Sequence, residues 1–152
     1  MDDNNYAASS ASPRHIFVIE DNPEHSLIAM RVLREVLGEE AEIIVTVNAY
    51  EAFYLLHHIT QYDRPDLILI DLRLANSDGF NLMAAAHAHE ACAQVPTLVI
   101  TGSVYDQDLA RWYELGSSTV LGKPSSRTNL HEELVRIWTL ARNSSRRRST
   151  SH

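Results

Sequence analysis

The chain has 152 residues and a formal net charge of −7, with 45% hydrophobic and 22% charged residues. These values are typical of one globular domain with a sizeable core. The acidic balance argues against non-specific nucleic-acid binding, and we identify no apolar stretch of membrane-spanning length. The single cysteine, Cys92, excludes an internal disulfide and favours a reducing compartment, which predicts a cytoplasmic protein.

Both ends of the chain are polar. Residues 1–13 are mostly small and polar, and residues 143–152 are rich in serine and arginine. Both compositions are too poor in apolar residues to form a core, so they predict disordered tails. The expected folded domain covers residues 14–142, and the arginines at 146–148 make the second tail basic.

Between the tails, short apolar runs alternate with helical patterns. The strands are expected at 15–19, 42–47, 67–71, 97–101 and 119–122. The helices are expected from Asn22-Pro23 to Gly38, from Asn48 to Ile59, from Asp78-Gly79 onward, from Ser103 to Gly116, and from Leu130 to Ala141. In the first helix the apolar residues follow the spacing of an amphipathic face. In the second, Asn48 and Glu51 have the spacing of a capping box.

Five strand–helix units with short connections predict a doubly wound α/β fold, because parallel neighbours need right-handed helical crossovers. We expect a five-stranded parallel sheet in the flavodoxin-like order 2-1-3-4-5, with helices on both faces. In that order the first and third strands are neighbours. The acids that end them, Glu20-Asp21 and Asp71, then lie close together.

Four strands end in residues with reactive or charged side chains. Besides these acids, Thr101 ends the fourth strand, and Lys123, the single lysine, follows the fifth. In an open parallel sheet, ligands bind at the carboxyl ends of the strands. Three carboxylates repel one another unless a cation lies among them, and Mg²⁺ prefers carboxylate oxygens. The set therefore predicts a site for a divalent cation and a phosphoryl group.

The ordered set of motifs resembles the receiver domain of two-component response regulators. The matching segments are Phe-Val-Ile-Glu-Asp-Asn-Pro at 17–23, Pro-Asp-Leu-Ile-Leu-Ile-Asp-Leu at 65–72, Asp-Gly-Phe at 78–80, Thr-Gly-Ser at 101–103, Gly116, and Lys-Pro at 123–124. The resemblance covers about residues 14–141. It implies that Asp71 accepts a phosphoryl group from a sensor histidine kinase.

The resemblance also implies the roles of the surrounding residues. Glu20, Asp21 and Asp71 would hold Mg²⁺, with the backbone carbonyl of Arg73 as a further ligand. Lys123 would pair with the phosphoryl oxygens, and Thr101 would move to donate a hydrogen bond to one of them. These roles agree with the need of phosphoryl transfer for charge neutralisation around an in-line nucleophile.

Two positions depart from the family pattern. Val120 stands where the family usually carries an aromatic residue that couples the site to the surface, and Ala75 replaces a common proline. The first departure leaves that coupling in question. The second concerns only the rigidity of the loop.

Several features resemble small stand-alone regulators of phytochrome-type kinases, among them Glu-Asp-Asn-Pro at 20–23 and Trp138. We expect a stand-alone receiver that is not an enzyme, does not bind DNA directly and does not enter a membrane. Its output would be contact with a downstream protein target or transfer to a phosphotransfer protein. We expect a homodimer whose interface is formed by three elements: the helix ending at Gly116, strand 119–122 and the helix from Leu130. Trp112 and Tyr113 would be its aromatic anchors.

Two alternatives remain open. One is a pseudo-receiver, a binding module that needs no phosphate, for which Val120 is the main support. The other is a Mg²⁺-dependent phosphohydrolase, which would usually carry an acid where Arg73 stands. The histidines at 57, 58, 87 and 89 are expected on helix surfaces, because they lack the partners of a zinc site.

Overall fold

The structure, a computed structural model, describes residues 15–60, 62–71, 76–101, 106–117, 119–122, 130–136 and 139. The predicted tails lie outside these residues, so the domain boundaries at 14 and 142 stay a prediction. None of the helices in the described ranges is both long enough and apolar enough to cross a membrane.

Five parallel strands form one sheet in the order β2-β1-β3-β4-β5. The strands are β1 His15–Glu20, β2 Glu42–Thr46, β3 Leu67–Asp71, β4 Thr97–Thr101 and β5 Thr119–Gly122. This arrangement confirms the predicted flavodoxin-like sheet. Only two boundaries differ from the prediction: β1 continues to Glu20, and β2 ends one residue earlier, at Thr46.

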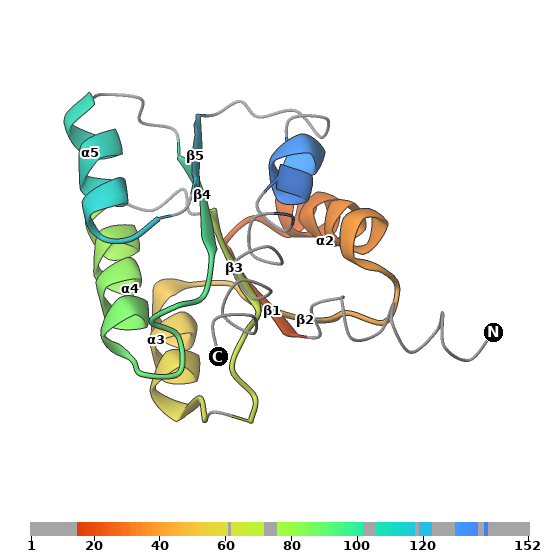
Figure 1. Ribbon diagram of the computed structural model, residues 1–152, viewed down its shortest axis with the longest axis horizontal. Coiled ribbons are helices and arrows are strands. Elements are labelled where there is room, and N and C mark those ends of the chain that lie inside the picture. The colour runs from red at the N-terminus through yellow and green to blue at the C-terminus, as the bar shows by residue number, and fades with distance from the viewer. Residues whose placement is uncertain are drawn as a thin grey trace, which may run out of the picture.

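Helices cover both faces of the sheet (Figure 1). They are α2 Pro23–Leu37, α3 Ala49–His58, α4 Asn76–Ala88 and α5 Asp106–Glu114, and residues 130–136 are also helical. Helices α3, α4 and α5 lie on one face, while α2 and the helical segment 130–136 lie on the other. Helix α4 begins two residues before the predicted start at Asp78.

Alternating strand residues build two separate cores. On β1, Phe17 and Ile19 pack toward α3–α5, whereas Ile16 and Val18 pack toward α2 and residues 130–136. The alternation follows from the two-residue period of a strand, whose successive side chains point to opposite faces. Because both faces are covered, β1 is apolar from Ile16 to Ile19 and β3 from Leu67 to Ile70, and each strand ends in an acid.

The caps of α2 and α3 follow the sequence signals. The Asn22 side chain accepts hydrogen bonds from the backbone N–H groups of Glu24 and His25, and Gly38 ends α2 with a φ of 104°. In α3, the Asn48 side chain accepts from the Glu51 N–H, and the Glu51 carboxylate accepts from the N–H of Val47. The reciprocal bond therefore reaches one residue further back than in a standard capping box.

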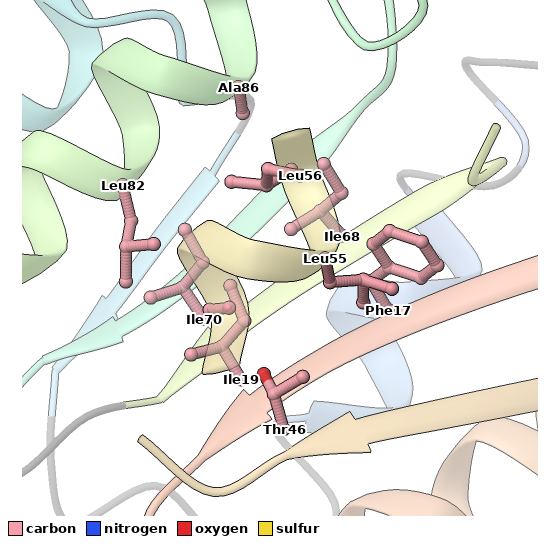
Figure 2. Close-up of a pocket in the computed structure, with 10 residues that line it drawn as sticks. Phe17, Ile19, Thr46, Leu55, Leu56, Ile68, Ile70, Leu82 and Ala86 are labelled. Atoms are coloured by element: carbon pink, nitrogen blue, oxygen red, sulfur yellow. The ribbon is translucent and has the colours of Figure 1, made fainter. Parts of the chain in front are cut away.

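The core between the sheet and helices α3 and α4 contains a narrow gap, shown in Figure 2. Its lining is apolar except for Thr46, at the end of β2. The Thr46 hydroxyl is buried and has no hydrogen-bond partner among the described residues. An apolar gap with one hydroxyl does not offer the two to four polar partners that an ordered water needs.

Two predictions about surface residues are wrong. Trp112 is expected to anchor an interface, but it is 2% exposed and belongs to the core, whereas Tyr113 beside it is 52% exposed. His87 is expected on a helix surface, but it is half-buried and its ring packs against Gly116, which has a φ of 107°. In both cases the packing of α5 and its following turn against α4 covers the side chain.

Candidate phosphoryl and metal site

Glu20 and Asp71 are direct neighbours at the carboxyl edge of the sheet. They are register partners in the parallel pair β1–β3, and they are 1% and 8% exposed. Both strands end here because the apolar run that keeps them inside the sheet ends here. Asp21 follows Glu20 immediately and is half-buried. The structure thus places Glu20 beside Asp71, with Asp21 next to Glu20 in the chain, although fifty residues separate Asp21 from Asp71.

The turn after β1 is held by local hydrogen bonds. The Asn22 backbone N–H donates to Glu20 Oε1 at 2.9 Å, while the Asn22 side chain caps α2. Pro23 then occupies the first helical position, where a missing N–H costs nothing. This turn keeps Glu20 and Asp21 at the carboxyl edge of the sheet, and α2 begins directly after them.

The remaining predicted site residues are placed only in part. Thr101 is the last residue of β4 and pairs with Gly122 of β5, so its backbone lies at the same edge as Asp71. Its side chain is not described. Arg73, Ala75 and Lys123 lie outside the described residues.

One residue near the site was missed by sequence reasoning. The ring of His25 on α2 has its Nδ1 3.8 Å from Glu20 Oε1. One ligand atom from each of Glu20, His25 and Asp71 lies within 4.8 Å of the others. Its place in the sequence could have indicated this, because His25 occupies the first turn of the helix that begins right after Glu20 and Asp21.

The donor set suits a hard divalent cation. Carboxylate oxygens from two adjacent strands lie close together at the carboxyl edge of the sheet, and Mg²⁺ binds through such oxygens while it keeps several waters. Bringing two buried carboxylates together without a cation is costly, because like charges repel and lose hydration. Glu20, Asp21 and Asp71 therefore fit Mg²⁺ by their chemistry.

Comparison with known proteins agrees with this geometry. Residues 16–135 match the response regulator receiver domain family. The chain belongs to this family. The receiver domain is 33% identical over 131 residues to the probable methanogenesis regulatory protein FilR2 of Methanothrix harundinacea, covering 83% of this chain and 84% of that protein.

Two further relatives are similar to this receiver domain. The response regulator Rcp1 of Synechocystis is 29% identical and is covered over 79% of its length, with 75% of this chain aligned. The phosphorylated cyanobacterial phytochrome response regulator RcpA has a solved structure with a TM-score of 0.67 and 25% identity, covering 82% of this chain and 90% of that one. A structure of Rcp1 bound to Mn²⁺ matches at 28% identity with a TM-score of 0.62, over 82% of this chain and 91% of that one. Other relatives are much longer, and the match spans as little as 8% of their length.

Val120, which stands where the family usually carries an aromatic residue, is half-buried in the edge strand β5 of this receiver domain. Its backbone N–H donates a hydrogen bond to the Tyr113 hydroxyl at 3.3 Å. The outer N–H groups of an edge strand have no strand partner, so a side chain from α5 satisfies this one. Tyr113 thus connects α5 directly to β5, on the side where the family aromatic would lie.

Proposed function

We propose that this receiver domain accepts a phosphoryl group on Asp71 from the phosphohistidine of a sensor kinase. The observation that carries the proposal is the register of Glu20 with Asp71, which assembles the acids at the carboxyl edge of the sheet. Membership of the receiver family supports it, since receiver domains are typically signalling modules rather than enzymes.

In the proposed step, a carboxylate oxygen of Asp71 attacks the phosphorus atom in line with the leaving imidazole. An O–P bond forms, the P–N bond breaks, and the electron pair stays on the imidazole nitrogen, which takes up a proton. Glu20 and Asp21 would hold Mg²⁺, whose charge offsets that of the carboxylates and phosphoryl oxygens. Its further ligand would be the Arg73 carbonyl.

We assign the readout to Thr101 and Lys123. Thr101 ends the strand adjacent to β3, at the edge that carries Asp71, and Lys123 follows the last residue of β5 in the sequence. An ammonium and a hydroxyl there would bind the new phosphoryl oxygens. Lys123→Ala should leave phosphorylation measurable but uncouple it from partner binding.

The proposed output is protein contact or onward phosphotransfer through α5, β5 and the following helix. The Tyr113–Val120 bond supports this, and so does Arg136, which donates to Thr119 on β5 and pairs with Glu133 at 2.8 Å. Shifts at the ends of β4 and β5 would reach this face first. The proposal includes a homodimer formed through this face. It also includes action as a stand-alone receiver in the cytoplasm, without direct DNA binding.

A phytochrome-type sensor kinase is the partner that we propose, supported by the similarity to Rcp1 and RcpA. Phosphotransfer from a purified phytochrome-type kinase, compared with a kinase of another sensor class, would test it. Equal or slower transfer from the phytochrome-type kinase would contradict this choice of partner.

Intact mass after incubation with Mg²⁺ and acetyl phosphate tests the central proposal. We expect one added phosphoryl mass, abolished by Asp71→Asn and retained by Asp63→Asn. Asp63 is the matched control because it is exposed and precedes β3, at the opposite end of the strand from Asp71. Labelling of the Asp71 variant at another residue would overturn the assignment. An unlabelled wild type would favour the pseudo-receiver, whose support is Val120.

A further inference from the structure

His25 is fixed beside the acidic site by the start of α2. Its backbone N–H donates to Asn22 Oδ1 at 3.0 Å, so the N-cap sets the direction in which the first turn leaves the sheet. The side chain is 35% exposed, whereas that of Glu20 is 1% exposed. The imidazole therefore lies at the solvent side of the buried carboxylate.

The ring is close to Glu20 without being hydrogen-bonded to it. The 3.8 Å between His25 Nδ1 and Glu20 Oε1 exceeds the range of about 2.7–3.2 Å for an N–H···O bond. Glu20 Oε1 instead accepts from the Asn22 N–H. A role limited to holding Glu20 through a direct hydrogen bond does not fit this spacing.

The same spacing is close to that between two atoms that bind one ion. With metal–ligand bonds of about 2.1 Å, an octahedral ion separates adjacent ligand atoms by about 3 Å and opposite ones by about 4.2 Å. The atoms of Glu20, His25 and Asp71 lie within 4.8 Å of one another, and they come from three elements, β1, α2 and β3. Small side-chain rotations would bring all three to one centre.

We propose that His25 is a nitrogen ligand of the divalent cation at this site and shifts its selectivity toward first-row transition ions such as Mn²⁺ and Co²⁺. This inference rests on the proposed function, since it uses the same carboxylates. Carboxylate and water suit Mg²⁺, whereas imidazole nitrogen favours the transition ions, increasingly from Mn²⁺ to Co²⁺. His25 would thus determine which cation supports phosphorylation of Asp71.

Electron spin-echo envelope modulation of the Mn²⁺-loaded protein tests this directly, because it detects nitrogen bound to the ion. We expect ¹⁴N coupling in the wild type and in His58→Ala, and its loss in His25→Ala and His25→Gln. His58 is the control because it is exposed on α3, which is not one of the elements that contribute ligands. Calorimetry should show a Co²⁺ dissociation constant at least about tenfold higher in His25→Ala, with that of Mg²⁺ changed less than about twofold.

Mn²⁺ bound without nitrogen coupling in the wild type would overturn the inference, as would coupling that persists in both His25 variants. The wild-type spectrum alone shows whether a nitrogen atom binds the ion, even if one variant folds poorly. Phosphorylation with Mg²⁺ but no nitrogen coupling would refute only the role of His25. Absence of both metal binding and phosphorylation would refute the proposed function as well.

Discussion

The indole ring of Trp112 on α5 lies directly against Gly79 on α4. A Cβ atom at position 79 would be 2.6 Å from the ring carbon Cη2. The ring is buried and also packs on Phe80, with 4.5 Å between ring centroids. The absence of a side chain at Gly79 therefore sets how closely α5 approaches α4.

Gly79→Ala should destabilise the protein by about 1 kcal/mol and by at most about 2 kcal/mol. Alanine gains about 1 kcal/mol in helix propensity, but overpacking a buried contact costs about 1–3 kcal/mol, and the trapped ring cannot move away cheaply. Urea denaturation measures the difference. Ala84→Ser, at an exposed position of the same helix, is the control and should change stability by less than about 0.5 kcal/mol. A Gly79 variant as stable as the wild type would show that the ring shifts freely.

Thr46→Val should stabilise the fold by about 1 kcal/mol, because it replaces a buried hydroxyl that has no hydrogen-bond partner among the described residues with a methyl group. The matched control is Thr97→Val. The Thr97 hydroxyl is also buried but donates to the Val95 carbonyl at 3.3 Å, so this change should cost about 1 kcal/mol. Thermal unfolding should show a higher Tm than the wild type for Thr46→Val and a lower Tm for Thr97→Val. Loss of stability in Thr46→Val would mean that the hydroxyl has a partner.

Asp21→Ala should weaken Mg²⁺ binding at least about tenfold, because Mg²⁺ dehydrates reluctantly and the site loses one of its few carboxylates. Phosphorylation of Asp71 by acetyl phosphate should slow in parallel. Calorimetric titration of the wild type, this variant and Asp63→Asn checks the affinity. Unchanged binding in Asp21→Ala would place the metal elsewhere.

Tyr113→Phe should lower stability by about 0.5–1 kcal/mol, because it removes the acceptor for the Val120 N–H while keeping the ring. The exposed position limits the loss, since water can replace the hydroxyl. Hydrogen exchange should show faster exchange at Val120 in the variant. Unchanged protection there would mean that the bond does not form in solution.

Cys92 should react slowly with Ellman's reagent in the folded protein. Burial raises the pKa of its thiol from 9.0 to about 11, so at pH 8 the reactive thiolate is about a hundredfold scarcer than in the unfolded chain. Because the folded state keeps the proton longer, this thiol's contribution to stability is complete below pH 9 and is lost between about pH 9 and 11. Comparable reaction rates in the native protein and in urea would contradict the burial.

Strand positions and their order were readable from the sequence. The apolar runs 97–101 and 119–122 become β4 and β5 with the predicted bounds, because a strand covered on both faces is a continuous apolar segment with a polar end. The five strand–helix units restrict the topology to very few arrangements. The strand pattern alone therefore places Glu20 and Asp71 side by side.

Tertiary packing decided what lies beside those strand ends and what the helices hide. A helical pattern shows that Trp112 and His87 are on helices. Only the packing of α5 and its following turn against α4, which puts Trp112 on Gly79 and Gly116 on His87, determines that the two rings are covered. Likewise, His25 follows Asp21 by four residues in the sequence, yet its nearness to Asp71 depends on the angle at which α2 leaves the sheet. Periodicity describes one element at a time, whereas contacts between elements depend on side-chain shape and on how closely backbones approach.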